Sequence, residues 1–479
     1  MEAGLAAERL TRTAPPVGVG LVHLGLGAFF RAHAALYLEE AVARFGGDWG
    51  VLGVSLQSPG TRDRLAPQGG SYWAVEMAPE AETARHVQIV QDVLVAPENP
   101  QAVLDAMAAP GVRIVSLTVT EKGYCHDPAT GRLNLAHPDI MHDMANPLPR
   151  SAPGFLVRAL AQRHARGLAP FTMLSCDNLP ENGRVLRAVV LELAAQISPA
   201  LADWIAAEGR FPSSMVDRIV PATKPQDIAR IASLTGQEDG APVLHEPFRQ
   251  WVIEDDFVGG ARPDLGAVGV MMVRDVTPFE HMKLRMLNGT HSALAYLGYL
   301  AGHETIAMTV ADPVFADYAR HLWQAEIIPA LAAPDGVDLH AYARQLLARY
   351  ANPAIHHRTW QIAMDGSQKL PQRLLGTLAQ NRAAGRRCDG LVLAVAGWMI
   401  YVRGTDLAGG MIDVRDPLAA ALRAAATSDD PVGALLAVQS IFPAGLAADL
   451  ATDLRAAHAR LLAQGSRAAV RMVTPGDGL

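Results

Sequence analysis

The pattern of apolar residues changes once along this chain, close to residue 275. Up to that point, short apolar runs of strand length alternate with segments of helical periodicity, as in Val17–Leu24 followed by Ala32–Phe45. From Pro278 onward, nearly every segment has helical periodicity and is rich in Ala and Leu. Alternating strands and helices are typical of a parallel sheet with helices on both faces. The sequence therefore predicts an α/β, doubly wound domain over residues 1–277, followed by an all-α domain over residues 278–479.

Further segments continue this alternation through the first half of the chain. The expected strands are Trp49–Leu56, Val112–Val119 and Phe171–Cys176, and the expected helices are Phe155–Arg166 and Glu181–Ile197. β-Branched residues are frequent in Val112–Val119, as is typical of a buried strand.

The composition excludes several classes of protein. Of the 479 residues, 50% are hydrophobic and 19% are charged, so the chain can bury a large core. A net charge of -7 is unlike that of a basic nucleic-acid-binding protein. The three cysteines are far apart, and the apolar run Leu391–Val402 is shorter than the roughly 20 residues that span a bilayer. We expect Leu391–Val402 to be a buried helix, and the protein to be cytoplasmic and to bind neither nucleic acid nor membrane.

A glycine turn follows the first expected strand and opens a helix. Gly25 and Gly27 would allow a tight turn and a close approach of the backbone to a pyrophosphate. Phe30 stands where the usual third glycine of a dinucleotide-binding turn would be. The turn alone is therefore compatible with dinucleotide binding and with a plain connection between a strand and a helix.

The end of the second expected strand bears on the choice of cofactor. No acidic residue stands at its tip, where NAD-binding turns usually have one to bind the ribose. Gln57 or Ser58 could bind a 2′-hydroxyl instead, whereas Arg62 or Arg64 could bind a 2′-phosphate. The choice between NAD and NADP stays open from these residues.

The densest group of polar residues lies between Phe279 and Ser292. On a regular α-helix, Lys283, Asn288 and His291 share an arc of about 140°. A buried lysine has a lowered pKa and can act as a general base, and a nearby amide can donate to a reacting oxygen. A solvated helix with a histidine at the edge of the core would show the same pattern.

Polar residues elsewhere suggest further contacts with a ligand. Thr120 and Glu121 end the third strand and would border a cofactor. Asn178 follows the fourth strand and would bind substrate; alternatively, Asp177 or Asn178 only caps the next helix. Asp217 lies between apolar residues and would orient a partner or form a structural contact with an arginine. Neither HExxH nor G-x-S-x-G occurs, so we expect no metal site and no serine nucleophile.

Several motifs occur in order along the chain. The polar helix has the pattern K-x-x-x-x-N-x-x-H, formed by Lys283, Asn288 and His291. The glycine turn has the pattern G-x-G-x-F-x-R-x-H, formed by Gly25, Gly27, Phe29, Arg31 and His33. Shorter motifs are CDN at 176–178, VDRIVP at 216–221, HEPF at 245–248 and DGS-x-K at 365–369. Together they resemble the long-chain mannitol dehydrogenase family over nearly the whole chain, and this resemblance implies a Rossmann-like first domain.

The resemblance also implies a metal-independent oxidoreductase that uses a nicotinamide cofactor and acts on a sugar alcohol or a sugar acid. It assigns Lys283 as the general base in oxidation and the general acid in reduction. Asn178 and Asn288 are expected to hold the reacting oxygen, which His291 positions, and Glu280 to carry protons. The expected substrate-binding residues are Asp217, Glu280, Arg358, Lys369 and Arg373. The expected cofactor-binding residues are Gly25, Gly27, Phe29, Phe30, Arg31, Gln57, Thr120 and Glu121.

The segment 352–373 resembles the fructuronate reductase branch of this family. Polyol-oxidising members typically have Arg at the position of Gln361, and Arg358, Lys369 and Arg373 are candidate partners of a carboxylate. We therefore expect an NAD-dependent, monomeric enzyme that interconverts D-mannonate and D-fructuronate, with NADP as the alternative cofactor. The alternative functions are a polyol dehydrogenase, such as mannitol 2-dehydrogenase, and a dinucleotide-binding regulator without enzymatic activity.

Overall fold

The chain forms two compact units, Met1–Thr277 (unit 1) and Pro278–Leu479 (unit 2). The computed structural model describes residues 8–127 and 130–474. In this described part, none of the helices is both long enough and apolar enough to cross a membrane.

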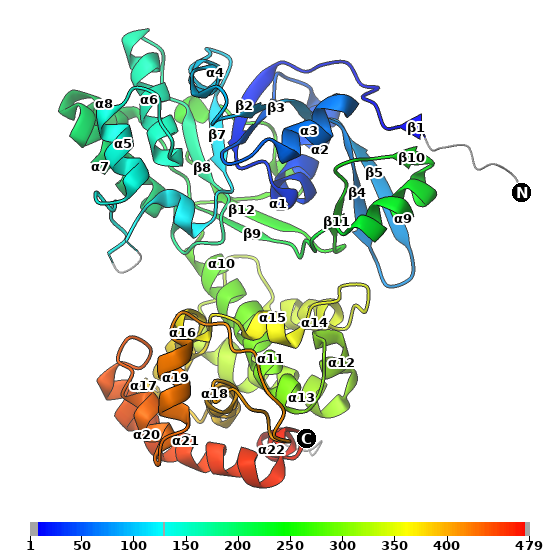
Figure 1. Cartoon of the computed structure of the whole chain (residues 1–479), viewed down its shortest axis with the longest axis vertical. Helices are drawn as coiled ribbons and strands as arrows, with labels where there is room; N and C mark the ends of the chain where they lie inside the picture. Colours follow the sequence, from blue (N-terminus) through cyan, green and yellow to red (C-terminus); the bar gives the residue numbers. More distant parts are fainter. Residues whose placement is uncertain (1–7, 128–129, 475–479) are drawn as a thin grey trace, which may run out of the picture. The chain divides into compact units, whose positions relative to one another are not determined.

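Unit 1 is built on a five-stranded sheet with the strand order β6-β3-β2-β7-β8, in which all neighbouring strands are parallel (Figure 1). Its strands are β2 (Val19–Leu24), β3 (Gly50–Ser55), β6 (Val90–Val95), β7 (Ile114–Leu117) and β8 (Thr172–Ser175). The chain runs from β2 outward to β3 and β6, and then continues on the other side of β2 with β7 and β8. This reversal puts the switch point of the topology between β2 and β7, where open α/β sheets bind their ligands.

Both faces of this sheet are buried. Successive residues of a strand point to opposite faces, and Leu21 and Val22 of β2 belong to two different hydrophobic cores. Helix α2 (Ala34–Phe45) contributes to the first core, whereas α6 (Ala152–Ala165) and α7 (Asn182–Ile197) contribute to the second. The predicted doubly wound architecture is therefore confirmed.

The remaining elements of unit 1 are short. The helices are α1 (Ala28–Ala32), α3 (Gly60–Leu65), α4 (Pro100–Met107), α5 (Pro138–Ala145), α8 (Pro199–Glu208) and α9 (Pro225–Thr235). Three small sheets join β1 (Glu8–Arg9) with β10 (Gln237–Glu238), β4 (Tyr72–Met77) with β5 (Glu82–Val87) and β11 (Val243–His245), and β12 (Gln250–Glu254) with β9 (Ser214–Asp217) and β13 (Met271–Val273). The sequence pattern did not indicate these strands, because segments of two to six residues are too short to show a clear period.

The expected helix Ala32–Phe45 is interrupted at His33. This residue has non-helical backbone angles, so α1 ends and α2 begins there. The imidazole of His33 is buried, and its Nε2 lies 2.9 Å from the carbonyl oxygen of Gln250. A tertiary contact at this point thus accompanies a break that helical periodicity does not reveal.

The regular secondary structure of unit 2 is helical, and no extended strand occurs among its described residues. Its α-helices are α11 (Thr290–Leu300), α12 (Ile306–Ala311), α13 (Pro313–His321), α14 (Leu339–Tyr350), α15 (Thr359–Ala363), α16 (Gly366–Leu370), α17 (Gly376–Ala383), α18 (Asp389–Tyr401), α19 (Ala419–Ala426), α20 (Pro431–Leu436), α21 (Ala444–Gln464) and α22 (Ser466–Val473). Every residue of α18 from Gly390 to Tyr401 is buried, which confirms the predicted buried helix. Helix α10 (Thr277–Met282) begins at the junction of the two units.

Candidate active site

The glycine turn after β2 holds the ends of β2 and β7 together. Gly25 has φ of +90°, and a Cβ there would overlap the carbonyl oxygen of Thr118. The Thr118 hydroxyl donates to the Gly25 carbonyl at 2.8 Å, and His23 Nε2 lies 2.8 Å from the same hydroxyl oxygen. Because that hydroxyl has only one proton, Nε2 of His23 must be the donor, and burial lowers the pKa of this imidazole to about 3. The fold itself therefore requires a glycine at position 25, independently of any ligand.

Gly27 differs from Gly25, because nothing in the fold requires a glycine there. Its φ is -84°, and a Cβ would come no nearer than 3.8 Å to the carbonyl oxygen of Gly25. The missing side chain therefore leaves open space at the start of α1, which is what a pyrophosphate needs in order to approach the backbone. On this test, the turn fits a dinucleotide.

The aromatic and basic residues that follow the turn are largely committed to the core. Phe30, which stands at the position of the missing third glycine, is 1% exposed and stacks on His23 with a distance of 3.6 Å between the ring centroids. Arg31 is buried, donates to the carbonyl of Ala241, and lies 5.3 Å from the ring centroid of Tyr72. Phe29 is half-buried. The proposed cofactor contacts of Phe30 and Arg31 are therefore limited to their backbones.

The tip of β3 favours a cofactor without a 2′-phosphate. Gln57 and Ser58 follow this strand and are exposed. Arg62 is already paired with two carboxylates, since its guanidinium lies 2.7 Å from Asp63 and also binds Glu98. With its charge compensated, Arg62 is a poor partner for a phosphate.

Asp177 fixes the loop after β7, and this role was missed in the sequence. Its carboxylate accepts the backbone N–H groups of Val119 at 3.0 Å and Thr120 at 2.8 Å, and the hydroxyl of Tyr124 at 2.8 Å. Thr120 has φ of +64°, a conformation that favours glycine and needs such support in a β-branched residue. Burial raises the pKa of Asp177. The clamp holds Thr120, and with it the neighbouring Glu121, beside the switch point.

Asn178 is exposed directly after Asp177. The alternative that Asp177 or Asn178 caps the next helix is wrong, because the N-cap of α7 is Glu181. Asn182 instead donates its side-chain amide to the Asp177 carbonyl at 2.9 Å. Asp217 ends β9 opposite Gln250 of β12, and it is only 4% exposed.

In unit 2, the segment that carries the candidate base is not a regular α-helix. A π-helix, Lys283–Gly289, lies between α10 and α11. Its hydrogen bonds connect residues five apart, so Lys283 and Asn288 lie on successive turns, and the expected α-helical arc does not apply to them. Such segments are frequent at functional sites. Lys283 is 8% exposed, and Asn288 is half-buried.

His291 lies in the first turn of α11 among aromatic and cationic neighbours. Its ring stacks on Tyr350 at 5.0 Å and meets His357 edge-on at 4.6 Å. Burial, and then the neighbouring imidazole of His357 and the positive charge of Arg373, hold the pKa of His291 well below its usual value. His291 is thus neutral at physiological pH and can exchange hydrogen bonds with an uncharged hydroxyl.

The three predicted carboxylate partners lie in different surroundings. Lys369 Nζ donates to the Met364 carbonyl at 2.6 Å, and burial together with Arg373 lowers its pKa to about 8. Arg373 donates to Ser292 Oγ at 3.1 Å. Arg358 is 59% exposed and lies 3.7 Å from Glu304. The structure therefore brings Lys369 and Arg373 near His291 and leaves Arg358 on the surface. Glu280, another predicted substrate-binding residue, is half-buried on α10.

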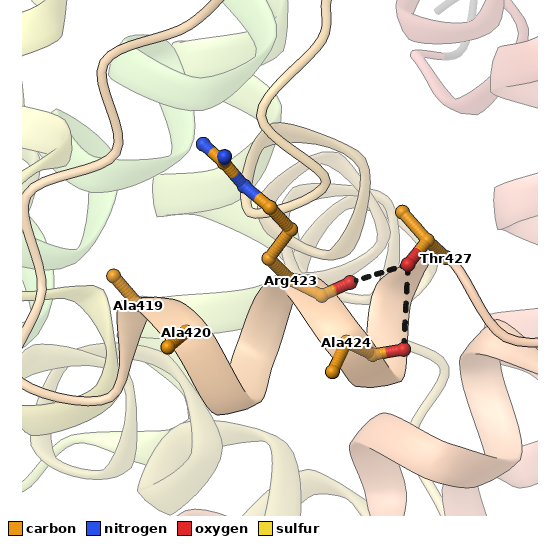
Figure 2. Close-up of a pocket in the computed structure, with 5 residues that line it drawn as sticks. All are labelled: Ala419, Ala420, Arg423, Ala424 and Thr427. Atoms are coloured by element: carbon orange, nitrogen blue, oxygen red, sulfur yellow. Dashed lines mark hydrogen bonds between the residues drawn. The ribbon is translucent and has the colours of Figure 1, made fainter.

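A pocket of about 560 Å³ on unit 2 contains none of these residues (Figure 2). It is lined by Ala419, Ala420, Arg423, Ala424 and Thr427. The Thr427 hydroxyl already donates to the Arg423 carbonyl at 2.9 Å, so Arg423 supplies the main polar contact. Across residues 8–127 and 130–474, no group of three His, Cys, Asp or Glu residues has a geometry that could hold a metal ion.

Comparisons with known proteins match both units. Residues 19–266 match the model of the mannitol dehydrogenase Rossmann domain, and residues 275–461 match that of the mannitol dehydrogenase C-terminal domain. The chain is 47% identical to D-mannonate oxidoreductase of Escherichia coli over 94% of each chain. It is 40% identical to mannitol 2-dehydrogenase of Phaeosphaeria nodorum over 94% of this chain and 80% of that one. The structure of mannitol 2-dehydrogenase of Pseudomonas fluorescens, in a ternary complex with NAD and D-mannitol, is similar with a TM-score of 0.85 and 37% identity over 98% and 97% of the two chains.

Proposed function

The chain belongs to the mannitol dehydrogenase family and is an oxidoreductase, and we propose that it interconverts D-mannonate and D-fructuronate with NAD as cofactor. The observation that carries this proposal is the pairing of a buried lysine, Lys283, with Asn288 on successive turns of a π-helix, close in sequence to the neutral His291. A relative of similar length that bears the name D-mannonate oxidoreductase supports the choice of substrate.

Each of these residues has a chemical role in the proposed reaction. In the oxidation direction, the neutral amine of Lys283 takes the proton of the reacting hydroxyl, and the carbon loses a hydride as its carbonyl bond forms. In the reduction direction, the ammonium form returns that proton to the new alkoxide. Asn288 donates to the reacting oxygen and stabilises its developing negative charge, which accelerates the chemical step. His291 orients the oxygen, and Asn178 of unit 1 is assigned to the same oxygen.

NAD, when bound, supplies the acceptor and donor of the hydride. The residues assigned to hold it belong to unit 1. They are Gly25, Gly27, Phe29, Phe30, Arg31, Gln57, Thr120 and Glu121. The open space at Gly27 supports the binding of a dinucleotide. The compensated charge of Arg62 supports NAD over NADP. Glu280, Asp217, Lys369 and Arg373 are assigned to the substrate, and no metal ion takes part, so activity is expected to survive treatment with EDTA.

A second candidate function is that of a polyol dehydrogenase acting on D-mannitol and D-fructose. It is favoured by the similarity to a mannitol 2-dehydrogenase whose structure contains NAD and D-mannitol. Gln361 weakens this alternative, because it is exposed and uncharged where polyol-oxidising members typically have an arginine.

The test is the rate of NADH consumption by the purified protein with D-fructuronate and with D-fructose, each repeated with NADPH. We expect faster turnover with D-fructuronate and with NADH. Preference for D-fructose would move the protein to the polyol-oxidising members of the family. Absence of turnover with both substrates would overturn the proposed reaction and leave only the family and the fold.

A further inference from the structure

Arg373 lies in a cluster of basic side chains in unit 2, in which the carboxylates of Asp365 and Asp416 act on Lys369 but no carboxylate pairs with Arg373 among the described residues. The positive charges of Lys369 and Arg373 act on both His357 and His291 and contribute to the lowered pKa values of these two imidazoles. Among the described residues, no carboxylate forms an ion pair with Arg373, and Lys369 has only Asp365, at 3.9 Å. Poorly hydrated positive charges placed close together are costly unless an anion offsets them.

Arg373 is poorly hydrated but not fully buried. Loss of hydration lowers its pKa, yet the residue keeps part of its accessible surface. Of its five N–H groups, one binds the Ser292 hydroxyl, and no other has a partner among the described residues. The nearby His357 has a buried Nδ1 that likewise has no hydrogen-bond partner in the described chain. A ligand with several oxygens would satisfy both side chains.

The basic cluster is packed against the π-helix that carries the candidate base, Lys283. A Cβ on Gly289 would lie 2.6 Å from the carbonyl oxygen of Arg373, so the segment Pro371–Leu375 packs directly on the π-helix of Lys283. Ser292, which accepts from Arg373, directly follows His291 in α11. The guanidinium is therefore held by the elements that hold Asn288 and His291.

We propose that Arg373 is the residue that binds the carboxylate of a sugar-acid substrate, with Lys369 as the second positive charge and His357 as a neutral hydrogen-bonding partner. This inference rests on the proposed function and names its specificity-determining residue. A guanidinium presents parallel N–H groups that match the two oxygens of a carboxylate. Lys369 already directs its ammonium group at the carbonyls of Met364, at 2.6 Å, and Ile362, at 3.5 Å, so it supplies charge more than free donors.

Arg358, the other candidate, serves as the matched control. It is exposed beside Glu304 and is not among the charges that act on His291. The experiment compares kcat/KM of the wild type, Arg373→Gln, Arg373→Lys and Arg358→Gln with D-fructuronate and with D-fructose. We expect Arg373→Gln to lower kcat/KM about 100-fold for D-fructuronate and less than about 3-fold for D-fructose.

The conservative variant separates recognition from folding. Arg373→Lys keeps the charge and should retain the wild-type Tm, with about a 10-fold loss for D-fructuronate because the two-point contact is gone. Arg358→Gln should match the wild type with both substrates. An equal loss for both substrates in the Arg373 variants, or no loss for either, would overturn the inference.

A binding measurement keeps this inference separate from the proposed reaction. With NAD present, D-mannonate should raise the Tm of the wild type but not that of Arg373→Gln, and D-mannitol should affect both proteins equally. Stabilisation by D-mannonate that depends on Arg373 supports the anion site even if D-fructuronate is not turned over, a result that would overturn only the proposed reaction. Failure of D-mannonate to stabilise the wild type overturns the inference.

Discussion

The two units build their candidate sites in opposite ways. In unit 1, the main chain is shaped into unusual conformations, with Gly25 and Thr120 at positive φ and Asp177 binding backbone N–H groups. In unit 2, the backbone stays helical, and the basic side chains of Lys283 and Arg373 are placed in poorly hydrated surroundings. Unit 1 thus presents a surface of backbone, suited to a ligand common to many enzymes. Unit 2 presents functional groups, suited to one reaction and one class of substrate.

The largest effect is expected when the amine of Lys283 in unit 2 is removed. We expect Lys283→Ala to lower kcat by about 10³-fold, because general acid–base catalysis typically contributes that much. The affinity for NADH, measured by fluorescence titration, should stay within about 2-fold. Lys224→Ala, at an exposed lysine of unit 1, is the control and should be fully active. Wild-type turnover by Lys283→Ala would remove Lys283 from the mechanism.

Two glycines in one turn test the role of the backbone in unit 1. Gly25→Ala should lower the free energy of unfolding by at least about 2 kcal/mol, because it combines a positive φ with an overlap at Thr118. Gly27→Ala should leave stability within about 0.5 kcal/mol and weaken NADH binding about 10-fold. Denaturant unfolding and fluorescence titration measure the two effects. Unchanged NADH affinity in Gly27→Ala would show that the open space there is not used by the cofactor.

The pH dependence of substrate binding sharpens the assignment of charge to unit 2. Burial and the charge of Arg373 lower the pKa of Lys369 from its ordinary value of 10.5 to about 8, so it loses its proton as the pH rises through about 8. The KM for D-fructuronate should therefore rise several-fold over this range, while that for D-fructose does not. The unfolded chain binds more protons between the two pKa values, so this group makes the fold more stable as the pH rises there. A parallel rise in both KM values would argue against a role of Lys369 in charge recognition.

The smallest effect is expected where unit 1 also uses a charged side chain. Glu98→Gln removes one of the two carboxylates that pair with Arg62. The released guanidinium should improve kcat/KM for NADPH relative to NADH by about 3-fold, because a surface ion pair contributes little free energy. Glu192→Gln, which breaks the Arg132 pair elsewhere in unit 1, should leave this ratio unchanged. An unchanged ratio in Glu98→Gln would show that Arg62 lies out of reach of the ribose.

Local patterns in the sequence predicted the fold class well. The strands Val17–Leu24 and Phe171–Cys176 were recognised because their apolar runs are flanked by turn residues, and they correspond to β2 and β8. The same approach missed the small sheets of unit 1, whose strands pair residues far apart in the chain. β4, for example, pairs with β11 through Ala74 and Val243.

For the candidate site, the motifs identified residues but not their surroundings. Lys283, Asn288 and His291 were predicted from their order, yet the π-helix that relates the first two was not, because its extra residue per turn leaves no mark in residue type. Asp177 was considered only as a helix cap, although an acid at the end of a parallel strand is itself a signal. Its function as a clamp depends on where Val119 and Thr120 lie.

The sequence by itself determined the glycine turn, the strand ends and the change from α/β to helical structure, because these follow from short-range sterics and from the period of apolar residues. Only the tertiary structure decided which basic residue faces His291, which arginine is compensated by acids, and which glycine is needed by the protein rather than by a ligand. These properties depend on burial and on the distances between charges, which are set by segments far apart in the chain, as with Arg62 and Glu98 or His291 and Arg373. The physical reason is that conformation is largely local, whereas hydration and electrostatic potential belong to the whole fold.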